Sequence, residues 1–366
     1  MKIIDWYIIR KLFTTTIFIV IIFTVIAVVI DTSEKADDFV KSGQTTYYII
    51  TNYFAGFVPF IISMIFPLML FISVILFTSQ MAGRSEIVAI LAGGVKFRRF
   101  LRPYLAGSIV MGAAFWFATQ FLIPEANVLR GNFQATYIDS KSSYEIGQYM
   151  SRGSNYYLRV DSNTYAGLRN YDTSSRTAYG GFFLEKLKGT DLVYNLRADY
   201  LRWDTALKGW KLEKVVERKI EGLHESVEFY EEMPVDLAIQ PSQIRPDKYL
   251  KDKMTTPELK EFIQMEENRG TEGLNDYKVE RYRRDATPFS VILLTIMGAI
   301  IASRKTRGGS GLHIALGFIL AAIFVVMDKF SLTFATKGNF HPLLAAWMPN
   351  LIFAIVTVVL YKKAPK

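Results

Sequence analysis

Six stretches of the chain carry apolar residues over lengths close to those of membrane-spanning helices. They are residues 12–30, a part of 54–80, 104–123, 286–303, 312–327 and 343–361. A transmembrane helix needs roughly 20 predominantly apolar residues. The pattern therefore predicts six spans, three on each side of a polar region. Pro124 and Glu125 are expected to close the third span.

The first apolar stretch fits two descriptions, an uncleaved span or the core of a cleaved secretion signal. It is long for a signal core, and no clear pair of small residues follows it to mark a cleavage site. We therefore interpret it as the first span, and the domain of spans one to three as residues 1–124.

The polar region, residues 125–285, has frequent charges of nearly balanced sign and no apolar run of membrane length. Between residues 156 and 235, short β-like segments alternate with turn signals such as DSN, GG, KGTD and LKG. The pattern predicts an inserted all-β domain over 125–253, either a sandwich or a jelly roll. A plain antiparallel sheet fits the same pattern.

Residues 254–285 are expected to form a helical connection back to the membrane. Thr256 is the predicted N-cap of its first helix, with Pro257 in the first turn and Gly270 as the terminator. A second helix is expected to begin near Leu274 and to lead into spans four to six, residues 286–366.

Charge gives the orientation of the predicted spans. The chain has a net charge of +9, and 14 basic but only 2 acidic residues fall in segments 1–11, 81–102, 304–307 and 362–366. Lys and Arg are retained in cytoplasmic loops. This distribution places both termini in the cytoplasm and the β-domain outside, and it explains the basic excess without nucleic acid.

The basic loop at residues 81–103 is the most distinctive of these segments. Its only acid, Glu86, precedes four apolar residues that we expect on one side of a short helix. These are Ile87, Val88, Ile90 and Leu91. Gly93 and Gly94 are expected to end the helix, because glycine readily adopts the left-handed conformation. Such a helix at the inner membrane surface is suited to receive force from a cytoplasmic partner.

The sequence gives little support for catalysis. There is no cysteine and no phosphate-binding loop motif, and the three histidines lie in separate regions. We therefore expect no enzyme, no metal and no cofactor. The middles of the predicted spans lack charge, which disfavours ion-coupled transport. Asp328 is placed at the outer end of the fifth span. An interfacial ion pair with Lys329, or two charges that extend toward water, is favoured there over a functional role for these residues.

Two lysines follow the first span. Lys35 and Lys41 could either contact lipid phosphate or remain solvated charges beside the membrane, and both readings fit the residues equally well.

Several segments together resemble the LptF/LptG (YjgP/YjgQ) permease family of the lipopolysaccharide export transporter. In the amino-terminal half they are IDWYIIRKLFTT, EKADDFVKSG and SEIVAILAGGVKFRRFLRP. In the carboxy-terminal half they are YRRDATPFSVILLTIMGAIIA, GFILAAIFVVMDKF and WMPNLIFAIVTVVLYKK. The resemblance covers nearly the whole chain, and the ending of the fifth span is more similar to LptG than to LptF.

The resemblance implies a six-span protein of the Gram-negative inner membrane with a periplasmic β-jellyroll. Its partners would be an LptB-type ATPase dimer, a paralogous LptF-type permease or a second copy, an LptC-type periplasmic protein and lipopolysaccharide. The first and fifth spans would form lateral gates for the lipid. Glu86, Ile87, Leu91 and Gly94 would couple the chain to the ATPase, although Leu91 stands where the family often has Arg or Gln. Lys35 and Lys41 would contact lipopolysaccharide phosphate.

Two other functions fit parts of the pattern. A mechanotransmission protein would pass ATPase motion outward without moving lipid, but such proteins typically place the external domain after the first of four spans. A membrane scaffold without transport would need no special cytoplasmic helix, so the loop around Glu86 speaks against it.

Overall fold

The computed structural model describes residues 3–139, 155–161, 163–169, 171–172, 175–189, 191–205, 209–222, 224–237, 249–269, 273–304, 311–338 and 340–364. Its contacts divide the chain into two compact units. The helical unit contains Met1–Ile138, Lys251–Lys260 and Asn275–Lys366. The other unit contains Asp139–Leu250 and Glu261–Leu274, and is built around a β-sheet.

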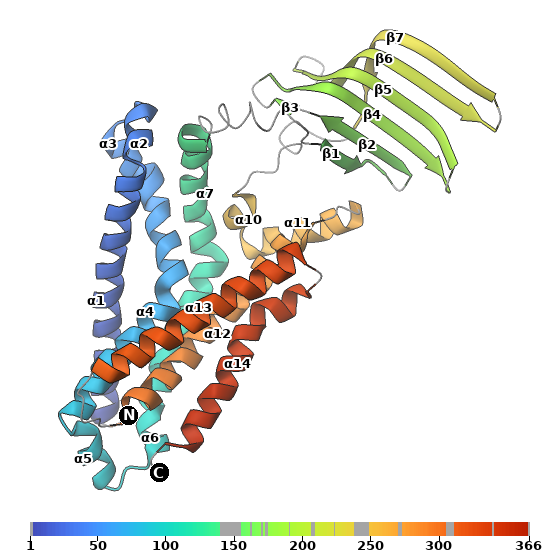
Figure 1. Cartoon of the computed structure of the whole chain (residues 1–366). Coiled ribbons are helices and arrows are strands. Elements are labelled where there is room, and N and C mark those ends of the chain that lie inside the picture. The colour runs from blue at the N-terminus through green and yellow to red at the C-terminus, as the bar shows by residue number, and fades with distance from the viewer. Residues whose placement is uncertain are drawn as a thin grey trace. The chain divides into compact units, whose positions relative to one another are not determined.

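The helices confirm the predicted pattern of three spans, an insertion and three spans (Figure 1). The first half contains α1 Ile3–Glu34, α2 Ala36–Ser42, α3 Thr46–Ile49, α4 Ala55–Gly83, α5 Glu86–Ala92, α6 Phe97–Phe117 and α7 Ile123–Phe133. The second half contains α10 Leu250–Lys253, α11 Thr256–Arg269, α12 Asn275–Ala302, α13 Gly311–Lys337 and α14 Pro342–Lys362. Six helical stretches among the described residues are long and apolar enough to cross a membrane.

The helix that contains the third predicted span does not end at Pro124. Helix continues from Phe97 to Ile138 through two π-helical segments, Ala118–Leu122 and Gln134–Ile138. Pro124 lies two residues after the end of the first of them, and such local changes of hydrogen bonding allow a membrane helix to tolerate a missing backbone donor. Residues 125–138, expected in the β-domain, are therefore helical.

The helical connection begins one residue earlier than predicted. Thr255, not Thr256, is the N-cap of α11, because its backbone N–H donates to Glu258 Oε2 at 2.8 Å as in a capping box. The predicted terminator Gly270 lies outside the described residues. The next helix, α12, starts at Asn275 beside the predicted Leu274.

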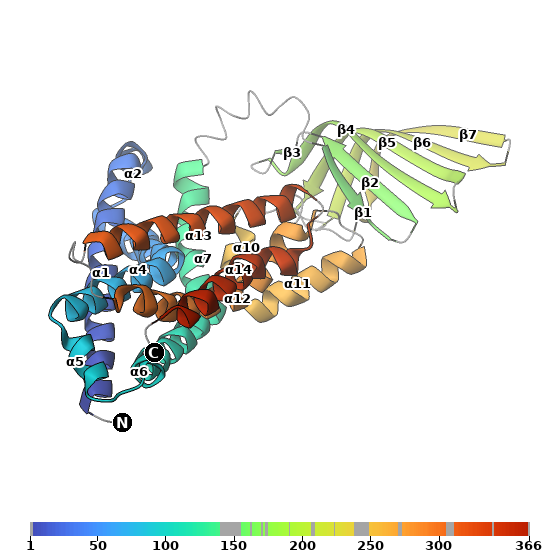
Figure 2. The same cartoon turned by 60° about the horizontal axis from the view of Figure 1, so that its bottom comes forward.

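Helix α12 packs against several neighbours in the helical unit. A Cβ on Gly298 would lie 3.1 Å from the Phe71 ring of α4, and a Cβ on Gly112 of α6 would lie 3.3 Å from the Pro288 carbonyl oxygen. The absence of side chains at these two glycines lets the helices approach closely. Figures 1 and 2 place the start of α1, the short helix α5 and the end of α14 at the same end of this unit.

Among the residues that the structure describes, the inserted unit forms an antiparallel sheet of seven strands. They are β1 Asn155–Arg159, β2 Thr164–Arg169, β3 Tyr171–Asp172, β4 Thr177–Lys188, β5 Asp191–Asp204, β6 Gly209–Glu221 and β7 His224–Val235. The order is β1-β2-β4-β5-β6-β7, with β3 paired to β4. This confirms the β-rich insertion. The sequential order is that of a plain meander, the third alternative open from the sequence.

Strand alternation creates one apolar face on this sheet. Side chains from four neighbouring strands form its core, including Leu168, Phe182, Leu196, Leu201 and Leu212. The glycine pair Gly180–Gly181 was expected to separate two strands. It instead lies inside β4, where both residues have positive φ and the register with β5 shifts. The pair therefore forms a β-bulge rather than a turn.

Candidate functional site

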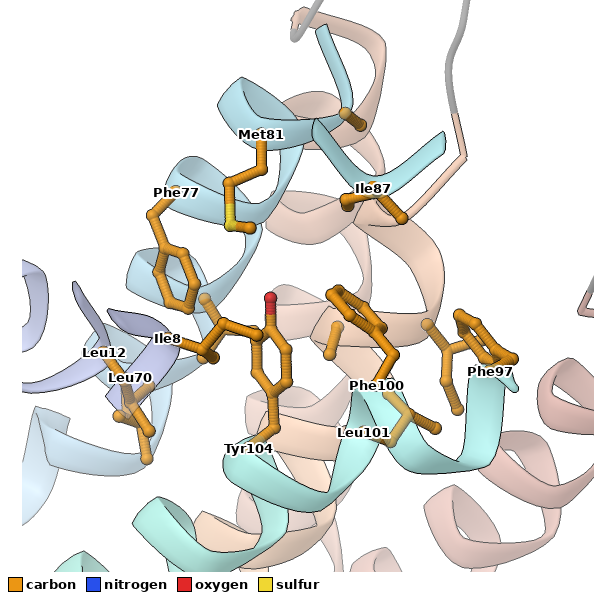
Figure 3. Packing of buried hydrophobic residues seen from close by; sticks show 14 of the residues in the cluster. Ile8, Leu12, Leu70, Phe77, Met81, Ile87, Phe97, Phe100, Leu101 and Tyr104 are labelled. Carbon is orange, nitrogen blue, oxygen red and sulfur yellow. The ribbon is translucent and has the colours of Figure 1, made fainter. Parts of the chain in front are cut away.

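The short helix α5 forms where the sequence predicts it and is fixed to the helical core by one side chain. Ile87 is 1% exposed and belongs to a buried cluster drawn from α1, α4, α6 and α12. Figure 3 shows Ile87 directed from α5 toward Phe100 and Tyr104 of α6. Because α5 has only seven residues, this single buried side chain is its main anchor.

The other apolar residues of α5 divide between two faces. Ile90 and Leu91 are half-buried and pack against the same cluster as Ile87, as expected for residues three and four positions further along a helix. Val88 is 51% exposed, so its predicted place on the same face was wrong. Gly94 has a φ of +81° and accordingly lies just beyond the helix end.

Glu86 begins α5 and keeps part of its carboxylate accessible. Its side chain is 31% exposed. The Tyr7 hydroxyl of α1 donates a hydrogen bond to Glu86 Oε2 at 3.2 Å, and the Arg84 guanidinium lies 4.0 Å from Oε1. A carboxylate in the first turn also interacts favourably with the helix dipole. The site therefore presents an oriented negative charge beside an apolar surface that includes Val88.

A buried ion pair lies beside this site and was missed from the sequence. The Arg99 guanidinium of α6 donates two hydrogen bonds to the Asp5 carboxylate of α1, at 2.8 and 2.6 Å. Asp5 is only 6% exposed. The sequence contained one signal, because Asp5 is a single acid in an otherwise basic start. Its partner, 94 positions away, could not be identified from spacing.

The lysines predicted to contact phosphate lie after the far end of α1. Lys35 Nζ is 2.5 Å from Asp31 Oδ1, hydrogen-bonds to the Tyr53 hydroxyl, and lies 5.7 Å from the centre of the Phe57 ring. Its ammonium is thus paired inside the chain, at the edge of an aromatic cluster. That cluster contains Phe39, Tyr53, Phe57 and Phe133. Lys41 is exposed on the last turn of α2.

A second polar network joins α7, α10 and α12. The buried Arg284 donates to the carbonyl oxygens of Lys251 and Met254 at 2.8 and 2.7 Å. Arg130 lies 3.8 Å from the Asp252 carboxylate. Burial raises the pKa of the Asp252 carboxyl above its ordinary value, although Arg130 and Arg284 oppose the shift. These contacts hold α10 against the helical unit.

Asp328 lies within helix α13, which continues past it to Lys337. Asp328 and Lys329 line a cavity of about 150 Å³ together with Arg283 of α12. Within the part of the chain that the structure describes, no ion pair joins Asp328 to Lys329.

These features define a class of protein. Six membrane-length helices, an inserted antiparallel sheet and a short helix fixed between two spans describe a multi-pass membrane subunit. The described residues also contain no cluster suited to a metal ion.

Comparison with protein families agrees with this class and narrows it. The family model for the lipopolysaccharide export system permease LptF/LptG matches residues 6–363. The chain therefore belongs to the LptF/LptG family, and it is a multi-pass protein of the inner membrane. A search of curated proteins gave no match. The family includes both LptF and LptG, and the similarity to LptG remains a prediction from the sequence.

Proposed function

We propose that this chain is the membrane subunit of an ATP-driven exporter that extracts lipopolysaccharide from the inner membrane and passes it to a periplasmic bridge of Lpt proteins. A separate LptB-type ATPase dimer supplies the energy through α5. The observation that carries this proposal is the geometry of α5. Ile87 fixes the helix to the core of the spans, while Glu86 keeps an oriented, partly exposed carboxylate for a partner.

The orientation of the chain follows from the same proposal. The start of α1, the end of α14 and α5 lie at one end of the helical unit (Figures 1 and 2). In this proposal that end faces the cytoplasm. The basic residues near α5 support this assignment, since positive loops stay inside. Leu91 and Gly94 complete the ATPase-coupling surface. The chain itself needs no cofactor and hydrolyses no ATP.

Lipid transfer uses the opposite side of the membrane. Lys35 and Lys41 contact lipopolysaccharide phosphate, and Lys35 exchanges its bond to Asp31 for a phosphate oxygen when the lipid arrives. The first and fifth spans form gates with a paralogous LptF-type permease or a second copy. The periplasmic sheet passes the lipid to an LptC-type protein.

The proposal is tested by co-purification of the tagged full-length chain from membranes, followed by identification of bound proteins and lipids. We compare the wild type with Glu86→Ala and with Glu125→Ala, a control that removes an exposed glutamate outside α5. The wild type and the control retain an ATPase and lipopolysaccharide. Glu86→Ala weakens ATPase binding by roughly tenfold or more, as expected for the loss of a hydrogen bond to a charged group.

Two other results would change the assignment. If the intact wild type retains no ATPase, the exporter proposal is wrong and a membrane scaffold is the better description. If it retains an ATPase without lipopolysaccharide, the chain transmits motion rather than lipid.

A further inference from the structure

Helix α1 contacts α5 through the side chain of Tyr7, a residue that the family resemblance did not include in the site. Tyr7 lies on α1, and its hydroxyl donates to Glu86 Oε2 at 3.2 Å. The other carboxylate oxygen, Oε1, faces the Arg84 guanidinium at 4.0 Å. One oxygen of Glu86 is therefore held by α1, and the other is directed toward the loop. A carboxylate held at one oxygen has fewer orientations to lose when a partner binds.

The same segment of α1 is fastened to α6. Asp5 accepts two hydrogen bonds from Arg99, and Ile8 is fully buried in the cluster that also receives Ile87. Asp5, Ile8 and Leu12 are all buried and lie at helical spacing, so they form the inward face of this segment. Tyr7 is adjacent to this face and reaches α5.

Further along, α1 buries less of its surface: 17% of its most apolar 18 residues are buried inside the chain, compared with 67% for α12. It is held there by individual contacts, such as the Thr16 hydroxyl, which hydrogen-bonds to Ser73 of α4 at 2.7 Å. The Asp5–Arg99 pair is a fixed point on this helix, and Tyr7 is the contact at which α5 acts on it.

We propose that Tyr7 is a positioning residue for the ATPase contact, which orients the Glu86 carboxylate and links movement of α5 to the first span. This inference rests on the proposed function, because it assumes that Glu86 contacts the ATPase. The Asp5–Arg99 pair fixes the first turns of α1 to α6, so that Tyr7 is held in place beside Glu86.

The test measures the affinity of the chain, purified with its partner permease, for its LptB-type ATPase. The variants are Tyr7→Phe, Glu86→Ala and the double variant, together with Tyr361→Phe. Tyr361 is exposed near the end of α14, and its ring stacks on Phe97 while its hydroxyl makes no hydrogen bond among the described residues. Removing that hydroxyl is a matched control for the loss of one tyrosine oxygen on the same side of the unit.

Tyr7→Phe weakens ATPase binding about fivefold, the ratio that corresponds to a net hydrogen bond of about 1 kcal/mol. Tyr361→Phe has no effect. In the Glu86→Ala background, Tyr7→Phe adds no further loss, because a positioning residue has nothing left to position. A merely structural role for Tyr7 would lower affinity by the same factor in both backgrounds.

The inference and the proposed function fail in different ways. If Glu86→Ala weakens binding while Tyr7→Phe behaves like Tyr361→Phe, the ATPase contact stands and the role of Tyr7 is wrong. An additive double variant overturns it as well. If the wild type binds no ATPase, both ideas are wrong. The number of lipopolysaccharide molecules moved per ATP hydrolysed gives a second readout, and Tyr7→Phe lowers it if α1 receives the movement.

Discussion

Ile87 is the side chain on which the position of α5 depends most. Ile87→Ala removes three buried carbon atoms from a residue that is 1% exposed. At about 0.8 kcal/mol for each buried methylene, the direct loss is about 2.4 kcal/mol, and an unfilled cavity adds to it. The helix has seven residues and no other fully buried side chain. Most of this loss therefore falls on the docking of α5 rather than on the fold of the spans.

The expected consequence is a local opening of α5. A loss of about 2.4 kcal/mol raises the undocked population roughly 50-fold. Hydrogen–deuterium exchange of the full-length chain in lipid nanodiscs measures this directly, because the amides of residues 84–94 exchange when α5 opens. Ile87→Val removes one carbon and raises local exchange about fourfold. Val88→Ala alters an exposed side chain and leaves the exchange of residues 84–94 unchanged.

Two results would contradict the prediction that Ile87 anchors α5. If Ile87→Ala and Val88→Ala give the same exchange in residues 84–94, Ile87 is not the anchor of α5. If exchange instead increases equally across all six spans, the substitution acts on the whole fold, and the separation between docking and folding is wrong.

Two further predictions concern the stability of the helical unit. Gly56→Ala lowers the thermal midpoint, because the new Cβ would lie 2.3 Å from the Ala126 carbonyl oxygen, whereas Gly83→Ala meets no atom within 4 Å and leaves it unchanged. Equal midpoints for the two variants would contradict this packing. The hydrogen bonds from Thr255 lower the pKa of the Glu258 carboxyl below its ordinary value. The stability that Glu258 supplies over Glu258→Gln is therefore complete above the ordinary pKa of a glutamate and is lost as the pH falls through the lowered pKa. A difference in unfolding that does not change as the pH falls through the acidic range would contradict this.

The sequence predicted well those features that depend on local pattern. Apolar length identified six spans, and β-like segments between turn signals identified the strands around Leu196 and Leu212. The position of α5 followed from a lone Glu86 before apolar residues and from glycine at its end. Each of these signals lies within one short segment, which is why no knowledge of the fold was needed.

Features that depend on other parts of the chain were predicted poorly. Pro124 looks like a helix end, but a π-helical turn before it lets the helix continue. Gly180–Gly181 looks like a turn and is a bulge, because β5 pairs with β4 on both sides of it. Asp5 and Arg99 meet across 94 positions, and no spacing rule reveals such a pair.

The candidate site shows the same division. Glu86 and Ile87 were found from the loop alone, but their different tasks, exposed charge and buried anchor, became visible only in the packed structure. Tyr7 was absent from the expected site because its role depends on where α1 and α5 meet. For Lys35, the sequence suggested a phosphate contact but gave no sign of its bond to Asp31.

The most direct test of the central claim is lipid transfer in proteoliposomes. The full-length chain is reconstituted with its partner permease, the LptB-type ATPase and lipopolysaccharide, and a soluble LptC-type acceptor is added outside. Lipopolysaccharide is expected to reach the acceptor only when ATP is hydrolysed. The rate of this transfer is expected to fall when Glu86 is replaced by alanine. ATP hydrolysis without transfer, or transfer at the same rate without ATP, would contradict it.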